Sequence, residues 1–238
     1  MKRMIVAMLA LCFVTGLVGC RENMSPDTQI KLLSQKMIEF STNAAYEECY
    51  FTLGDLNDDS EVELIVSCQG GSGLFSTTHV YKIDKQGDFV EFDYCYNGYE
   101  SEPDIIGEDL QMYSVREADG IRNYYVTEDH IRSGISHYTY RVSLITFQND
   151  CVLEIPMAKI EHDYECEDSV SFINADGNEI TEDQFENCVD RYFENDDVTR
   201  YTVHFEWIFA DEILGKSQEE IEKILGDCYR NFSKLHQE

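Results

Sequence analysis

The stretch RYTVHFEWIF, residues 200–209, alternates large apolar and polar side chains along almost its whole length. The apolar series consists of Tyr201, Val203, Phe205, Trp207 and Phe209, and the polar series of Thr202, His204 and Glu206. Side chains two residues apart lie on the same face of a strand. This period of two therefore predicts an antiparallel strand with one buried and one solvated face. It also predicts that Trp207 is buried.

A second alternating stretch, DFVEFDYCY, covers residues 88–96. Its predicted buried face carries Val90, Phe92, Tyr94 and Tyr96. Other segments of strand-like composition lie at 61–67, 78–84, 110–116, 121–127, 137–147 and 151–160. Turn-forming residues separate several of them, at 84–88, Asp119–Gly120 and Asn149–Asp150. We therefore expect successive hairpins of one meandering sheet.

Helices are predicted at both ends of this region. Ser25 and Pro26 are suited to the N-cap and the first turn of a helix that runs to about Phe40. Its buried stripe is Ile30, Leu33, Met37 and Phe40. A capping box from Thr181 to Gln184 precedes a second predicted helix, whose apolar residues are Phe185, Cys188, Val189 and Tyr192. Another capping box, from Ser217 to Glu220, precedes a third, whose apolar residues are Ile221, Ile224, Leu225, Cys228, Phe232 and Leu235. We expect a single α+β domain, residues 26–238, in which an antiparallel meandering sheet is flanked by an N-terminal helix and C-terminal helices.

The composition limits the classes of partner. The chain has 47 Asp and Glu against 18 Lys and Arg, a net charge of −29, and 43% of its 238 residues are hydrophobic. This length and hydrophobic content are ample for a buried core. The negative charge repels phosphate backbones, so we expect no nucleic-acid partner. Cations, basic proteins and neutral glycans are compatible with it.

The N-terminus has the pattern of an export signal. Lys2 and Arg3 precede an apolar run, Met4 to Val18, that is shorter than a membrane-spanning helix requires. The run ends in Leu-Val-Gly-Cys, residues 17–20, which resembles the lipobox of bacterial lipoproteins. The resemblance implies that residues 1–19 are a signal peptide and that Cys20 receives a lipid with acyl chains such as palmitate. It also implies that residues 20–25 form a short tether to the outer face of the cytoplasmic membrane, at the cell surface.

Seven further cysteines follow Cys20: Cys49, Cys68, Cys95, Cys151, Cys166, Cys188 and Cys228. They form no CxxC pair and show no spacing typical of a zinc site. Several stand at apolar positions of the predicted elements, which favours buried thiols. Export would also permit disulfides, and one or two remain an alternative.

The segment FTLGDLNDDSEVELIV, residues 51–66, is the best candidate for a chemical site. Asp55, Asn57, Asp59 and Glu63 occupy positions 1, 3, 5 and 9 of a loop between two apolar segments. Short oxygen-bearing side chains at this spacing can converge on one hard cation. The segment is similar to the calcium loop of integrin-type FG-GAP propeller repeats. It also resembles a loop that occurs once in many uncharacterised lipoproteins of Gram-positive anaerobes. The resemblance implies Ca²⁺ held by these four residues.

Two residues depart from the calcium-loop pattern. Position 6 is Ser60 rather than glycine, and position 12 is Val66 rather than the glutamate of an EF-hand. A propeller needs several such repeats, so only the loop is carried over. The alternative is an Asp/Asn-rich turn whose side chains cap their own backbone amides.

The sequence identifies no catalytic residue. GGSGLF, residues 70–75, lacks the second glycine of a nucleophile elbow, and the six histidines show no metal-binding spacing. These patterns favour a non-enzymatic binding or interaction module for a protein or a glycan. Tyrosine-rich strands could line a glycan groove, although a half-buried sheet accounts for them more simply. An envelope hydrolase, and an inhibitory or structural partner of another envelope protein, are the alternatives.

Overall fold

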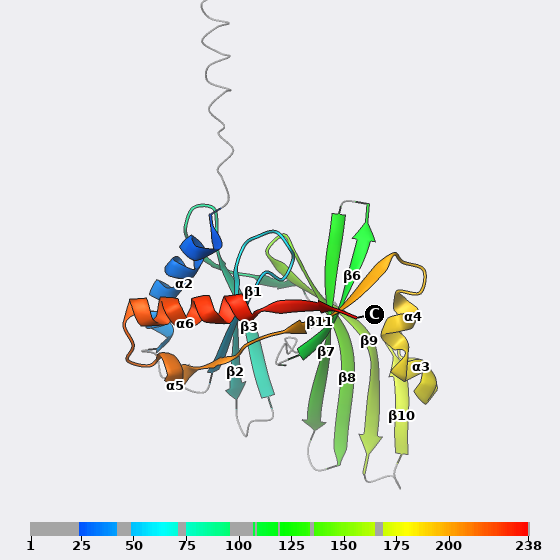
Figure 1. Cartoon of the computed structure of the whole chain (residues 1–238). Coiled ribbons are helices and arrows are strands. Elements are labelled where there is room, and N and C mark those ends of the chain that lie inside the picture. Colours follow the sequence, from blue (N-terminus) through cyan, green and yellow to red (C-terminus); the bar gives the residue numbers. More distant parts are fainter. Residues whose placement is uncertain are drawn as a thin grey trace, which may run out of the picture.

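A computed structural model describes residues 24–41, 49–70, 75–95, 107, 109–118, 120–133, 136–164 and 169–237. It contains two β-sheets and several helices, and it confirms the predicted α+β class, with one helix at the start and others near the end (Figure 1). None of the helices in these ranges is both long enough and apolar enough to cross a membrane.

The smaller sheet has five strands in the order β12-β1-β2-β3-β4, and all neighbours are antiparallel. Its strands are β1 (Cys49–Gly54), β2 (Glu63–Gly70), β3 (Phe75–Ile83), β4 (Phe89–Glu91) and β12 (Ile208–Phe209). Strands β1 and β2 form a hairpin, and the candidate metal loop is the connection at its closed end.

The larger sheet has the order β10-β9-β8-β7-β6-β11-β13, and β5 adds a parallel pairing to β9. Its strands are β5 (Asp93–Cys95), β6 (Asp109–Glu117), β7 (Gly120–Ser133), β8 (His137–Gln148), β9 (Cys151–Asp163), β10 (Ser169–Asn174), β11 (Val198–His204) and β13 (Ser233–His236). The register of β8 and β9 shifts between Val142 and Ser143, opposite Pro156. This irregularity accommodates a proline that has no N–H to donate to the ladder.

The helices cover the outer faces of the two sheets (Figure 1). The smaller sheet packs against α2 (Pro26–Ser41), α5 (Ala210–Ile213) and α6 (Gln218–Asn231). The larger sheet packs against α3 (Glu182–Glu186) and α4 (Cys188–Tyr192). A third cluster of buried residues lies between the sheets, so the domain has four layers: helices, sheet, sheet, helices.

Strand alternation assigns the residues of β2 to two of these layers. Leu64 and Val66 face the helical layer of α2 and α6, whereas Ile65 faces the larger sheet. Strand β6 behaves in the same way, because Met112 faces the central core and Tyr113 faces α4. Both faces of each sheet are therefore buried over much of their area, which explains the apolar runs that interrupt strict alternation.

The prediction of one meandering sheet is wrong, and the stretch 200–209 shows the reason. Strand β11 ends at His204, and residues 205–207 lead across to β12, which belongs to the smaller sheet. The apolar face consequently changes side. Ile208 is buried, whereas Phe209, predicted on the buried face, is 51% exposed.

The stretch 88–96 also passes from one sheet to the other. Strand β4 pairs with β3 in the smaller sheet, and β5 pairs with β9 in the larger one. Phe92 stands between them, fully packed in the central core, while Val90 and Tyr94 are only partly buried. Tyr96 lies outside the described residues.

Both predicted C-terminal helices need correction. The first is divided at Asn187 into α3 and α4. The second ends at Asn231, because Phe232 has an extended backbone and the chain continues as β13. Leu235, predicted on the buried stripe, lies in this edge strand and is 61% exposed. Both capping boxes are confirmed.

The prediction that the cysteines are mainly buried thiols is wrong for the strands. Cys49 and Cys68 form a disulfide between directly opposite positions of β1 and β2. Cys151 is also disulfide-bonded. Cys228 is a buried free thiol and Cys188 a half-buried one. Strand pairing brings the first two cysteines together, a contact that cysteine spacing alone does not contain.

Trp207 provides a test of the packing between the sheets. Its ring is partly buried against the central core, and its indole Nε1 donates to the carbonyl of Gly107 at 2.8 Å. It is the single tryptophan of the chain. We expect native emission at a shorter wavelength than in denaturant, because unfolding transfers the indole to water. Emission spectra across a urea titration measure this shift, and an unchanged maximum would contradict the packing.

Candidate functional site

Residues 55–63, here called the acidic loop, close the β1–β2 hairpin and begin β2. Asp55 accepts hydrogen bonds from the backbone N–H of Asp59 and of Ser60, both at 3.1 Å. Asp59 in turn accepts from the N–H of Glu61 at 2.7 Å. The carboxylates at positions 1 and 5 therefore organise the backbone of the turn.

Asn57 completes this arrangement. Its Oδ1 accepts from the N–H of Asp59 at 3.2 Å, and its Nδ2 donates to the Asp59 carboxylate at 2.9 Å. Asp58 and Ser60 have positive φ angles of 61° and 68°. They make the sharp bends that glycine would make with less strain. Asp55, Asn57 and Asp59 thus lie in one turn whose side chains cap its own backbone amides, as the alternative of an Asp/Asn-rich turn predicts.

Glu63 differs from the other three predicted ligands because it is completely buried. Its Oε2 accepts from the N–H of Leu56 at 2.8 Å. Its Oε1 is also buried and has no hydrogen-bond partner among the described residues. A buried carboxylate oxygen without a partner is costly, and a proton or a nearby cation would offset that cost.

The charges of the loop act on one another. Burial raises the pKa of Glu63 well above its usual value, and the negative charges of Asp59 and Asp55 raise it further. Burial likewise raises the pKa of Asp55, against the opposing charge of Lys234. Burial is the largest cause of both shifts, so both carboxyl groups resist ionisation in the folded protein.

The donor set fits a hard cation, although the described side chains are not arranged around one. Among the residues that the structure describes, no group of three or more His, Cys, Asp or Glu side chains is close enough to hold a metal ion. Glu63 is instead directed to the N–H of Leu56. However, three carboxylates and one amide offer only oxygen ligands, and Glu63 Oε1 supplies the unpartnered buried atom that a ligand set requires.

Gln29 connects the acidic loop to helix α2. Its Nε2 donates to the carbonyl of Ser60 at 3.3 Å, and its Oε1 accepts from the N–H of Val62 at 2.7 Å. The side chain is 1% exposed. Gln29 lies next to the apolar residue Ile30 in sequence, and no pattern identifies it as a partner of the loop.

The larger sheet holds the other side of the loop. The carbonyl of Leu56 accepts from Tyr125 Oη at 2.7 Å and from Asn123 Nδ2 at 3.2 Å. Asp58 accepts from Asn123 at 2.7 Å and pairs with Lys234 of β13 at 2.7 Å. The acidic loop therefore joins the two sheets.

Lys82 forms a second connection between the sheets. Its Nζ lies 2.7 Å from Glu61 in the loop and 2.5 Å from Asp150 in the β8–β9 turn. Burial lowers the pKa of Lys82, but hydrogen bonds to Asp150 and Glu61 outweigh it and raise the pKa to about 12. The lysine is therefore charged while the protein is folded.

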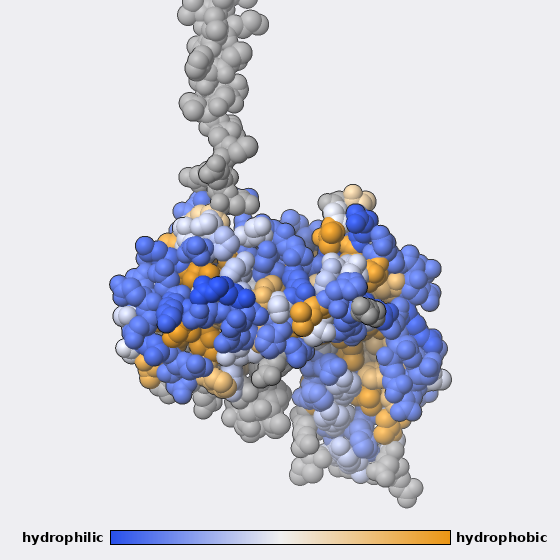
Figure 2. Space-filling model, in the orientation of Figure 1, coloured by the Kyte–Doolittle hydropathy of each residue, from blue (hydrophilic) through white to orange (hydrophobic). Residues whose placement is uncertain are grey.

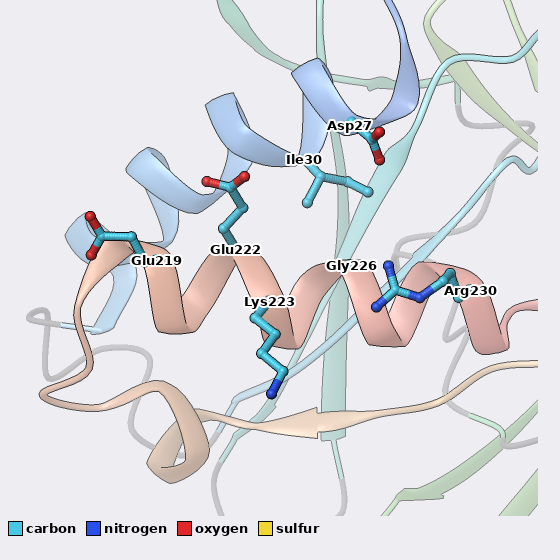
Figure 3. A pocket seen from close by; sticks show the side chains of 7 residues that line it. All are labelled: Asp27, Ile30, Glu219, Glu222, Lys223, Gly226 and Arg230. Atoms are coloured by element: carbon cyan, nitrogen blue, oxygen red, sulfur yellow. The ribbon is translucent and has the colours of Figure 1, made fainter.

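A groove of about 440 Å³ lies between α2 and α6 (Figure 3). Asp27, Ile30, Glu219, Glu222, Lys223, Gly226 and Arg230 line it. In Figure 3, Lys223 points away from α2, whereas Glu222 points towards it. Four of the charged residues that line it, Asp27, Glu219, Lys223 and Arg230, are exposed to solvent.

The histidines with close ionic partners are each paired with one carboxylate. His79 lies 2.7 Å from Glu91, and His204 lies 2.9 Å from Asp109. Both pairs join neighbouring strands, and their side chains are partly exposed to solvent. Ser72 of the segment 70–75 lies outside the described residues.

Comparison with known proteins shows no relationship: no family model, no curated protein and no solved structure matches this chain.

Proposed function

We propose that this chain is a lipid-anchored extracytoplasmic protein whose folded domain is a non-enzymatic binding module stabilised by calcium. Cys20 is the proposed anchor, and Asp55, Asn57, Asp59 and Glu63 are the proposed calcium ligands. The observation that carries the calcium assignment is the buried, unpartnered Oε1 of Glu63 beside two further carboxylates.

The lipobox, residues 17–20, lies outside the described residues, so the anchor rests on its sequence pattern. The Cys49–Cys68 disulfide supports the proposed export, because disulfides persist in oxidising compartments. Helix α2 begins at Pro26, only six positions after Cys20. An extended tether of that length reaches about 20 Å, which would hold the domain close to the membrane.

Replacement of Cys20 by alanine tests the anchor. We expect the variant to lose fatty-acid labelling and to keep residues 1–19, because the thiol that accepts the lipid is absent. Two acyl chains hold a protein on a membrane almost permanently, so the wild type should sediment with membranes. Metabolic labelling with a palmitate analogue and membrane fractionation measure both effects. A Cys20→Ala protein that still incorporates label would contradict the proposal, and Cys12→Ala is the matched control.

The loop residues would have two roles, which are to shape the turn and to bind calcium. Asp55 and Asp59 already accept hydrogen bonds from backbone N–H groups of the turn, and these bonds fix the orientation of both carboxylates. Glu63 closes the loop against the N–H of Leu56. A bound calcium ion would supply the positive charge that these carboxylates lack. Because the same loop contacts α2, β7 and β13, its order affects both sheets.

Calcium in this position would act on stability rather than on a reaction. Buried hydrogen bonds anchor the loop to Gln29 of α2 and to Asn123 of β7, which suits a structural ion. The wide, partly uncovered face of the larger sheet would then be free to bind a partner. This division supports a binding module whose ligand surface and metal loop are separate.

A further inference from the structure

Two rows of side chains cross the larger sheet on the face that carries α3 and α4. Row 1 consists of His130, Tyr140, Ile160 and Phe172, which are directly opposite one another on β7, β8, β9 and β10. Row 2 consists of Tyr138, His162 and Val170 on β8, β9 and β10. Tyr164 follows His162 by two residues and lies against its ring, with ring centroids 4.0 Å apart. Opposite positions share a face, so these side chains form one surface, here called the ring face.

Helix α3 covers one end of the ring face only. Phe185 of α3 contacts Tyr140 and Phe172, with centroid distances of 5.9 Å and 5.6 Å. Away from this contact, side chains of the ring face are exposed to solvent. Val170 is 47% exposed and Tyr164 is 54% exposed. Figure 2 shows the hydrophobic residues that gather over β8 and β9, with hydrophilic surfaces on both sides.

The rings of this face carry polar atoms that are held in place. Tyr138 Oη makes a hydrogen bond with Nδ1 of His130. Tyr140 is hydrogen-bonded to Glu128, on the same face of β7, and burial together with that carboxylate raises the pKa of the phenol. The Tyr140 hydroxyl therefore stays neutral, and the hydrogen-bonded rings lose little freedom on binding a ligand.

The size of the ring face suits a short chain of sugar rings. Strands lie about 4.8 Å apart and alternate residues about 7 Å apart. Row 2 crosses three strands and therefore spans about 10 Å, and Tyr164 extends it. Flat rings beside hydroxyl, imidazole and carboxylate groups match a ligand with apolar ring faces and hydroxyl edges.

We propose that the ring face binds a neutral oligosaccharide. The net charge of −29 and Glu128 repel acidic glycans, so the glycan that this face binds is a neutral one. This assignment deepens the proposed binding module by naming its ligand class, and it is independent of the calcium loop.

The test uses the folded domain, residues 20–238, and two neutral tetrasaccharides, one of glucose and one of N-acetylglucosamine. A sulfated oligosaccharide serves as the anionic comparison. Titration calorimetry and ligand-observed NMR measure binding. We expect binding of at least one neutral tetrasaccharide and none of the sulfated one. Loss of one stacked ring in Tyr164→Ala should weaken binding about fivefold.

Tyr192→Ala is the matched control, because Tyr192 is 47% exposed but lies on α4, away from both rows. Tyr164→Phe should retain most of the affinity, since it keeps the ring. The thermal midpoint of each variant verifies the fold.

Absence of binding to both neutral tetrasaccharides would overturn the proposal. So would a dimer that Tyr164→Ala dissociates, because the face would then bind a second copy. Neither result would affect the anchor or the calcium loop, which membrane fractionation and calcium titration test separately.

Discussion

Loss of the Cys49–Cys68 disulfide is expected to lower the free energy of unfolding by about 3 kcal/mol, because the bridge closes a chain segment of 19 residues. In the double variant Cys49→Ala, Cys68→Ala the unfolded chain regains the entropy that this closure removes. For a domain of this size, such a change corresponds to a fall of about 6–12 °C in thermal midpoint. Calorimetric or circular-dichroism melting measures it.

Packing and cross-linking must be separated in this experiment. Cys49 is 2% exposed, so alanine also removes a buried sulfur atom. A variant with Cys49→Ala alone loses both the bridge and that atom. Cys68→Ala alone loses the bridge but keeps the buried Cys49 sulfur. Comparable destabilisation in both single variants would therefore identify the cross-link as the cause. Cys188→Ala is the control for a half-buried free thiol. If the double variant had the same thermal midpoint as the wild type, the pairing of β1 and β2 would not depend on the disulfide.

The predicted strands were largely confirmed because each contains local information. Residues 110–116, 137–147 and 151–160 lie within β6, β8 and β9, and the turn at Asn149–Asp150 connects the last two. Asn149 and Asp150 both have positive φ angles, as the short hairpin between them requires. A period of two and a turn signal are properties of neighbouring residues, so a sequence displays them directly.

Membership of a sheet is not a local property. Phe92 and Phe205 continue the alternation of their strands, yet each lies where the chain passes from one sheet to the other. Both side chains pack in the central core. An apolar side chain at such a crossing satisfies the same pattern as one inside a strand. The sequence therefore predicted the strand content but could not divide it between two sheets.

The candidate metal loop shows the same limit. The hydrogen bonds that Asp55 and Asn57 accept inside the loop join residues two to five positions apart, so they are set by local sequence. Its external contacts join residues 31 positions apart for Gln29 and 176 for Lys234. Burial of Glu63 follows from these distant elements. The unpartnered oxygen that makes the loop a candidate site is thus a consequence of the tertiary fold.

Calcium is expected to raise the thermal midpoint of the wild-type domain by about 3–5 °C when its concentration is ten times Kd. Binding to the folded state alone contributes RT ln(1 + [L]/Kd), or about 1.4 kcal/mol. The loop lacks a twelfth-position glutamate, so we expect a Kd of about 10⁻⁴–10⁻³ M, typical of extracellular calcium modules. Magnesium at the same ionic strength should raise the midpoint less, because general screening of the acidic protein is common to both ions.

Two variants separate metal binding from turn formation. Asp55→Ala should abolish the calcium response. Asp84→Ala should preserve it, because Asp84 accepts N–H groups of Gln86 and Asp88 in another acidic turn that has no predicted ligand set. Equal responses of these two variants to calcium, or equal shifts by both metals in the wild type, would contradict the site.

Glu63→Gln is the sharper variant because its effect should change sign with calcium. Without metal, glutamine removes a buried charge near Asp55 and Asp59, so the variant should melt above the wild type at neutral pH. With saturating calcium the order should reverse, because a neutral amide is a weaker ligand.

The metal-free comparison should also depend on pH, because the pKa of Glu63 is raised in the folded state. Protonation of Glu63 therefore stabilises the folded protein. This contribution is fully present below the ordinary pKa of 4.5 and is lost as the pH rises through the pKa of the folded state. The metal-free difference between the two proteins should therefore shrink as the pH falls towards 4.5. A variant that melts below the wild type in chelator at neutral pH would show that Glu63 is stabilised without a cation.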